Sequence, residues 1–412
     1  MAREQDAPKK NIALIPLNNK AYLSLILIFT PSLNFLSGIT IDIYSPSLPT
    51  LTVYFNTSMT LVKNTLSITL LGWALGSMIF GLLIDTLGRK PILAYALIAY
   101  VLSSFLATLT HSISGFMVLR FMQGFTISAI SIGCRAIIVD YFTGPRYLIA
   151  ILYTSIGYGL APLVGPFIGG ILQYYVSWKA SFITLSALGS LLLLILAIFI
   201  SESVHQKQQL SLTQIPKKIK PILFNKSFIA GIILLGLMQI QTLIYPTLGP
   251  FLVIDILKKD TITFGNSALL VGASYLIGTM INRLLLHFLT AKTACFIGYL
   301  ILLLGLALSL SFSIFSPINL ITIMLPLIII CLSSGLIFSN IMAVNLMQFP
   351  HSAGLATSII MTLMLLTTTA GTFIMSHIHI SHLSQLSLMI TSLSIMQIMI
   401  FSRYFKTVFN NS

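Results

Sequence analysis

The chain has 412 residues, of which 57% are apolar and 7% charged, and its mean hydropathy is +1.00. A soluble domain has about 25% charged residues, so this composition excludes a soluble fold and indicates a membrane protein. The net charge of +14 comes from Lys and Arg beside apolar runs rather than from one basic patch, which excludes a nucleic-acid-binding protein.

Long apolar runs recur along the whole chain. A helix that crosses a bilayer needs about 20 mostly apolar residues, because lipid offers no partners for backbone N–H and C=O groups. The sequence therefore predicts an all-α membrane protein with twelve transmembrane helices. The predicted spans are residues 21–43, 62–84, 91–110, 113–139, 147–172, 179–200, 226–251, 266–288, 291–313, 317–342, 352–376 and 380–404.

The basic residues are divided unevenly between the two sides of these spans. An even number of spans places both termini on one side, whose loops and ends carry 16 of the 22 Lys and Arg residues. These are Arg3, Lys9, Lys10, Lys20, Arg89, Lys90, Arg146, Lys207, Lys217, Lys218, Lys220, Lys226, Arg283, Lys292, Arg403 and Lys406. The other side carries Lys63, Lys179, Lys258 and Lys259. Because cytoplasmic loops are enriched in Lys and Arg, we expect both termini in the cytoplasm and the chain in a bacterial inner membrane.

The longest polar stretch within the chain divides it into halves. Residues 201–225 follow the sixth span and predict a cytoplasmic linker whose lysines meet anionic headgroups. The predicted parts are an N-terminal tail (1–20), a first bundle (21–200), the linker, a second bundle (226–404) and a C-terminal tail (405–412). The first apolar run is too long for a signal peptide. Two pseudo-symmetric six-helix bundles are typical of transporters that handle substrate at the midplane between the halves.

Acidic residues are scarce, which narrows the candidates for proton transfer. Six of the eight lie in tails, loops or the linker: Glu4, Asp6, Asp85, Glu202, Asp255 and Asp260. Asp42 and Asp140 remain within or beside spans, where an ionisable group is a functional candidate. Desolvation moves the pKa of a carboxyl group toward the working range, so Asp42 is the predicted proton carrier. An interfacial aspartate ahead of Pro46 is the alternative.

The loop between the second and third spans reads GLLIDTLGRKP and contains Gly81, Asp85, Gly88, Arg89 and Lys90. A glycine able to take a left-handed turn and a proline able to start a helix suit a tight turn between two spans. The full string is more specific than such a turn requires. It resembles the signature loop of the major facilitator superfamily of membrane transporters, which implies a conformational gating loop here.

The fourth span contains a buried cation. The segment LRFMQG, with Arg120, resembles an arginine motif of the same superfamily. At about 1.5 Å per residue, Arg120 lies roughly 12 Å into the span, too deep for easy snorkelling. A structural arginine bonded to backbone carbonyls is the alternative to a functional one. By resemblance, Asp85, Arg89, Arg135 and Asp140 form a charge cluster that latches the outward-facing state, and snorkelling of Arg135 is the alternative.

The fifth span is rich in glycine and proline. Glycines permit close helix contact, and each proline removes an intrahelical hydrogen bond and allows a bend. The Gly-Pro-x-x-Gly-Gly core resembles a motif found in the antiporters of the superfamily, while a kinked packing helix is the alternative. The motif residues are Gly157, Pro162, Gly165, Pro166, Gly169 and Gly170.

The segment IDIYSPSLP, from Ile41 to Pro49, is similar to the Asp-x-Tyr-x-Pro-x-x-Pro segment of the Bcr/CflA drug-efflux subfamily, within the 12-span drug/proton antiporters. RAIIVD at 135–140 and the trio of Gly278, Asn282 and Arg283 suggest the same subfamily.

One residue departs from the multidrug pattern in the first span. Some multidrug relatives carry a second acid about two turns deeper, where this chain has Asn34, which cannot titrate. We therefore expect a neutral or anionic substrate, with Asp42 and Arg120 as an interacting pair.

Metal and disulfide signals are weak. Three cysteines fall inside spans and have neither disulfide nor zinc spacing. His377, His379 and His382 either cap a loop or bind a metal, and we expect no metal and no cofactor.

The leading prediction is a monomeric proton-coupled exporter of drugs or a secreted metabolite such as a siderophore. It would have the bilayer, protons and a small molecule as its partners, and the proton gradient as its energy source. A nutrient symporter is the alternative, and an intramembrane enzyme a remote one. No hydrolase, zinc-protease or phosphate-binding motif is present, so we expect no enzyme activity.

Overall fold

The computed structural model describes residues 19–203, 215–349 and 353–408. All regular elements of these residues are helices. In chain order they are α1 (Asn19–Asp42), η1 (Ser45–Ser47), α2 (Leu48–Tyr54), α3 (Met59–Leu87), α4 (Arg89–Ala107), α5 (Ile113–Tyr141), α6 (Gly144–Tyr175), α7 (Trp178–Phe199), α8 (Ile215–Leu223), α9 (Lys226–Pro250), η2 (Phe251–Ile256), α10 (Thr261–Leu285), α11 (Ala291–Phe315), α12 (Leu320–Met347), α13 (Ala353–Ser376) and α14 (Leu383–Val408).

Within this part of the chain, 12 helices are long and apolar enough to cross a membrane, which confirms the predicted number of spans. The first span is longer than predicted and runs from Lys20 to Tyr54. After Asp42 the chain passes through the 3-10 turn η1 and continues as the short helix α2. Pro46 and Pro49 stand in the first turns of these two elements, where a missing N–H removes no intrahelical hydrogen bond. Asp42 therefore lies at a break within the span rather than at its outer end.

The seventh and eighth spans also differ from their predicted limits. The seventh span ends in a π-helical turn, η2. The eighth begins at Thr261, because Asp260 caps α10 by accepting a hydrogen bond from the Thr263 N–H at 2.7 Å. Hydrogen bonds that the Asp260 carboxylate accepts from the backbone and side chain of Thr263 hold the pKa of Asp260 below its ordinary value.

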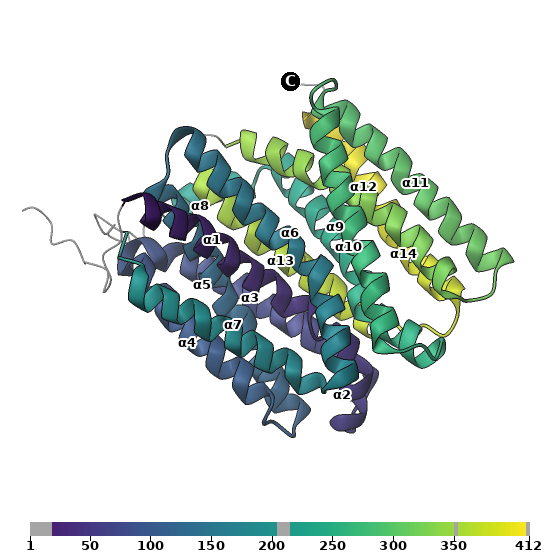
Figure 1. Ribbon diagram of the computed structural model, residues 1–412. Coiled ribbons are helices and arrows are strands. Elements are labelled where there is room, and N and C mark those ends of the chain that lie inside the picture. Colours follow the sequence, from purple (N-terminus) through teal and green to yellow (C-terminus); the bar gives the residue numbers. More distant parts are fainter. Residues whose placement is uncertain (1–18, 204–214, 350–352, 409–412) are drawn as a thin grey trace, which may run out of the picture.

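The helices form two bundles with separate hydrophobic cores. Helices α1–α7 build most of the first core, to which Leu243, Phe251 and Leu365 also belong, and α8–α14 build the second. Figure 1 shows the first group in purple to teal and the second in green to yellow. The bundles meet along two helix pairs, α3 with α13 and α6 with α10. Of the predicted linker, residues 204–214 lie outside the described residues, as do 1–18 and 409–412 of the tails.

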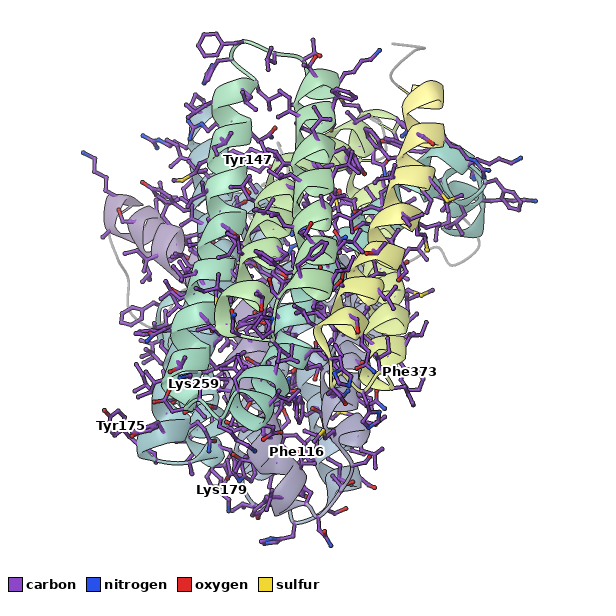
Figure 2. The ribbon with its side chains drawn as sticks, turned by 90° about the vertical axis from the view of Figure 1, so that its right-hand side faces the viewer. Phe116, Tyr147, Tyr175, Lys179, Lys259 and Phe373 are labelled. Atoms are coloured by element: carbon purple, nitrogen blue, oxygen red, sulfur yellow. The ribbon has the colours of Figure 1, made fainter. Side chains whose placement is uncertain are left out.

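The two ends of the helical bundles differ in their loops. We call the end with the α3–α4 turn at Gly88 the basic end, and the other the opposite end. Figure 2 places Tyr147, near the start of α6, toward the basic end, and Tyr175, Lys179 and Lys259 toward the opposite end.

Candidate functional site

Asp42 is the last residue of α1 and is buried, with 6% of its surface exposed. Its Oδ1 atom has no hydrogen-bond partner among the described residues. A side chain at Gly165 of α6 would have its Cβ 3.1 Å from the Asp42 Cβ, so α6 packs directly on this residue. A buried carboxylate without a cation beside it is costly, whereas a neutral carboxyl group is much less so. The site therefore suits a group that gains and loses a proton.

Asn34 lies about two turns from Asp42 on α1, and both residues contact α6. Asn34 Nδ2 donates to the Thr154 carbonyl of α6 at 3.0 Å, and Ser131 Oγ of α5 donates to Asn34 Oδ1 at 3.3 Å. An ionised carboxylate could not donate to a carbonyl oxygen. The amide thus joins three helices.

Helix α6 touches α1 on one face and α10 on another. An added Cβ at Gly157 would lie 2.5 Å from the Pro31 carbonyl oxygen, and one at Gly169 would overlap the Ile43 carbonyl oxygen. On the other face, an added Cβ at Gly170 would lie 2.5 Å from the Thr261 carbonyl oxygen of α10. Helix α1 belongs to the first bundle and α10 to the second. Because of these glycines, α6 packs closely both on α1, which carries Asp42, and on α10 across the boundary between the bundles. The helix runs through Pro162 and Pro166 without interruption.

Arg120 is enclosed inside the first bundle, with no exposed surface. Its Nη1 donates to Gln123 Oε1 at 2.6 Å, and its Nη2 donates to the Thr40 carbonyl oxygen at 3.2 Å. The guanidinium carbon lies 4.2 Å from the centroid of the Tyr44 ring and 5.7 Å from that of Phe182. These contacts favour the structural alternative for Arg120, while its Nε has no hydrogen-bond partner among the described residues.

Asp42 and Arg120 were expected to interact directly, but the salt bridges among the described residues do not include one between them. Successive residues of a helix are rotated by about 100°, so Thr40 and Asp42 point to nearly opposite sides of α1. Arg120 approaches the side of Thr40, while Asp42 faces Gly165. Tyr44, which our sequence reading gave no role, interacts electrostatically with both charged residues.

Replacing Arg120 with Met should lower the thermal stability of the purified protein. The change leaves the buried Gln123 side chain and Thr40 carbonyl without a donor, at about 1–3 kcal/mol for each unsatisfied group. Arg146→Met, which removes an exposed cation, should leave the unfolding temperature nearly unchanged. Equal unfolding temperatures for the two variants would contradict the structural role of Arg120.

The predicted gating loop forms a charge cluster at the basic end. Arg89 pairs with Asp85 at 2.7 Å and with Asp140 of α5 at 3.1 Å. Arg89 Nη1 also donates to the Ile84 carbonyl oxygen at 3.0 Å. Gly88 has a φ of +109°, a region that favours glycine. The signature loop thus uses Gly88 for its backbone conformation and Arg89 for its ion pairs with Asp85 and Asp140.

Glu202 completes this cluster, although the sequence placed it in the linker. Gly88 precedes α4 and has no side chain to cap it, and the Glu202 carboxylate accepts the N–H groups of Arg89 at 3.0 Å and Lys90 at 3.2 Å. Ser203 Oγ donates to Asp140 Oδ2 at 2.5 Å. The start of the linker is therefore fixed to the gating loop. The signal in the sequence is a lone acid directly after the sixth span.

The other residues predicted for the gating cluster contribute unequally. Lys90 Nζ donates to the Ala197 carbonyl oxygen at 3.3 Å. Gly81 lies beside α13, where an added Cβ would be 3.5 Å from Ser358 Oγ. Arg135 is half-buried and forms no salt bridge with a described residue, so the structure does not bring it into the cluster.

Replacing Glu202 with Ala should destabilise the protein by about 0.5–2 kcal/mol, the usual effect of losing a helix cap. Glu202→Gln keeps an oxygen acceptor and should lose less. Thermal unfolding of the purified variants measures both. If Glu202→Ala matches the unaltered protein, the capping role is refuted.

Hydrogen bonds between the bundles gather at the opposite end. Four such bonds join described residues: Lys63 Nζ to the Ile378 carbonyl at 2.9 Å, Asn64 Oδ1 with Ser376 Oγ at 2.5 Å, Ser67 Oγ to Thr372 Oγ1 at 3.0 Å, and Thr261 Oγ1 to the Gly170 carbonyl at 2.9 Å. The structure is therefore closed at this end.

The described residues contain no group of three His, Cys, Asp or Glu side chains placed to hold a metal ion. His377 Nδ1 instead lies 2.9 Å from the Phe373 carbonyl oxygen and 3.2 Å from Ser376 Oγ, at the end of α13.

Two helical bundles that meet along two helix pairs, with a buried carboxyl group beside their boundary, define a membrane transporter of the two-bundle class. A family model described as the Major Facilitator Superfamily matches residues 32–372. The chain therefore belongs to the major facilitator superfamily, as its motifs predict, and is a multi-pass membrane transporter rather than an enzyme.

Known proteins similar to this chain include drug-resistance proteins. It is 27% identical over 330 residues to the chloramphenicol resistance protein CraA of Acinetobacter baumannii, covering 78% of each chain. It is 31% identical over 185 residues to a bicyclomycin resistance protein homolog of Haemophilus influenzae, covering 45% of each chain. The crystal structure of a D-xylose-proton symporter aligns with a TM-score of 0.74 at 16% identity, covering 92% of this chain and 97% of that one, which shows the shared fold.

Proposed function

We propose that the protein is a proton-coupled exporter of small organic molecules that works by alternating access of its two bundles. The observation that carries the proposal is the buried Asp42 carboxyl group, which has an unpartnered oxygen and packs against Gly165 of α6. The names of the chloramphenicol and bicyclomycin resistance relatives support export rather than uptake. We place the chain in the Bcr/CflA group of drug/proton antiporters and expect it to act as a monomer.

The proposed cycle links protonation to the contact between α6 and α10. In this conformation the opposite end is closed, and the bond between Thr261 and Gly170 holds α6 against α10. Separating the bundles there would break this bond and change the surroundings of α6, including the side that packs on Asp42. Proton binding at Asp42 can thereby favour one conformation over the other, because a ligand shifts an equilibrium by its difference in affinity between two states.

The orientation follows from the distribution of charge. We propose that the basic end faces the cytoplasm of a bacterial cell, with both termini on that side of the inner membrane. The closed opposite end then faces outward.

The substrate is a drug or a secreted metabolite such as a siderophore. Our earlier expectation that Arg120 attracts an anion loses its support, because the side chain is fully enclosed. Asn34 is neutral and already hydrogen-bonded to two helices. A neutral substrate therefore fits the charges of the first bundle best.

Transport in everted vesicles tests the direction and the coupling together. Candidate compounds come from a comparison of resistance and accumulation in cells with and without the gene. An exporter should concentrate the compound inside everted vesicles when respiration acidifies the lumen, and an uncoupler should release it. A nutrient symporter would fail to concentrate its substrate under the same conditions, and that result would refute the proposal.

A further inference from the structure

A cavity of about 270 Å³ lies between the bundles at the closed opposite end. Its walls include Lys63 of α3 from the first bundle, Phe251 and Asp255 of η2 from the second, and Ile378 and His379 after α13. Sites for drug-sized ligands usually measure about 300–1,000 Å³, so this one suits a smaller molecule. Because it adjoins the hydrogen bonds that close this end, it is distinct from the site around Asp42.

Lys63 is the residue that gives the cavity its chemistry. Its side chain is 3% exposed, and its Nζ atom lies 5.9 Å from the centroid of the Phe251 ring. Among the described residues, Nζ donates one hydrogen bond, to the Ile378 carbonyl oxygen at 2.9 Å, and forms no salt bridge. An ammonium group has three donors. Two donors of a buried cation therefore remain for a ligand.

The other charges of the cavity do not neutralise Lys63. Asp255 lines the same wall and is half-buried, but it forms no salt bridge with Lys63 among the described residues. Most of the remaining wall is apolar, since it includes Phe251, Leu252 and Ile378. A mostly apolar cavity with a buried cation that has no salt-bridge partner among the described residues favours a small anion with an apolar body.

We propose that this cavity is a binding site for small organic anions, in which Lys63 binds the anionic group and the Phe251 side of the wall contacts the apolar body. The walls come from both bundles, so the complete site exists only while the opposite end is closed. A bound anion stabilises the closed conformation by its affinity for it and thereby opposes the return of the transporter to the outward-open state. The inference goes beyond the proposed export function and does not depend on the coupling role of Asp42.

Benzenesulfonate is a suitable probe, because it stays ionised at any working pH and carries no proton across a membrane. Its binding to the purified full-length protein is measured by isothermal titration calorimetry in detergent at pH 7. Benzenesulfonamide has nearly the same shape without the charge. We expect benzenesulfonate to bind and benzenesulfonamide to bind at least tenfold more weakly.

Variants of the cavity walls locate the binding. Lys63→Met should weaken benzenesulfonate binding at least tenfold, and Lys63→Arg should restore most of it. Lys179→Met is the matched control, since Lys179 lies at the same end, against the rings of Tyr54 and Trp178, outside the cavity. Asp255→Asn should strengthen binding several-fold by removing a like charge, a gain that misfolding could not produce.

The results separate this site from the proposed transport site. Asp42→Asn should leave benzenesulfonate binding unchanged even if it abolishes transport. The inference is overturned if the unaltered protein does not bind benzenesulfonate, or if Lys63→Met and Asp255→Asn both bind it as the unaltered protein does. Weaker binding in Asp42→Asn with full binding in Lys63→Met would place the anion in the central site and would also overturn it.

Discussion

Asp42→Asn is expected to abolish proton-driven accumulation in everted vesicles while leaving a folded protein in the membrane. The amide occupies the same space as the carboxyl group, and the unpartnered Oδ1 of Asp42 means that no hydrogen bond of this atom to a described residue is lost. A neutral amide also avoids burying a charge, so the unfolding temperature should stay the same or rise. The variant cannot release a proton, so the gradient can no longer drive substrate against its concentration.

Counterflow distinguishes a loss of coupling from a loss of binding. Exchange of labelled for unlabelled substrate needs alternating access without a net proton step, so Asp42→Asn should retain it. Asp260→Asn is the matched control, because asparagine caps a helix about as well as aspartate and Asp260 lies outside the spans. Full accumulation by Asp42→Asn would remove Asp42 from the mechanism.

The sequence was sufficient for those features that depend on local composition. Apolar runs long enough to span a bilayer predicted all twelve transmembrane helices, and the signature loop predicted the pairing of Arg89 with acidic neighbours. The first span was predicted too short because hydropathy gave no reason to continue it past Pro46. Prolines at the first turn of a helix are compatible with its continuation, as η1 and α2 show.

Contacts between segments far apart in the chain could not be predicted from the sequence. Glu202 caps a helix that begins 113 residues earlier, and no local pattern links the two. Arg120 and Asp42 were expected to interact, since the predicted spans 113–139 and 21–43 place both residues in the outer half of the membrane. Depth along a helix does not give rotation about its axis, and it is the rotation that turns Asp42 toward α6 and leaves Arg120 beside Thr40.

Gly169→Ala tests whether the contact between α1 and α6 is as close as the structure shows. An added Cβ would overlap the Ile43 carbonyl oxygen, and a backbone atom cannot move aside unless the two helices separate. We expect a loss of stability of about 1–3 kcal/mol, typical of overpacking, together with a severe loss of export. Thermal unfolding and vesicle transport measure the two effects.

A Gly→Ala substitution at a position with free space should not destabilise the protein. Gly354 of α13 has no atom within 4 Å of an added Cβ, so Gly354→Ala should be neutral or stabilise the protein by up to about 1 kcal/mol, as Ala normally does in a helix. Gly165→Ala is intermediate, since its Cβ would press on the Asp42 Cβ at 3.1 Å, a side-chain contact that can adjust. It should therefore alter proton-coupled accumulation more than stability. Equal stability and equal export for Gly169→Ala and Gly354→Ala would show that Gly169 makes no close contact with α1. That result would refute the proposal that α6 couples Asp42 to the second bundle.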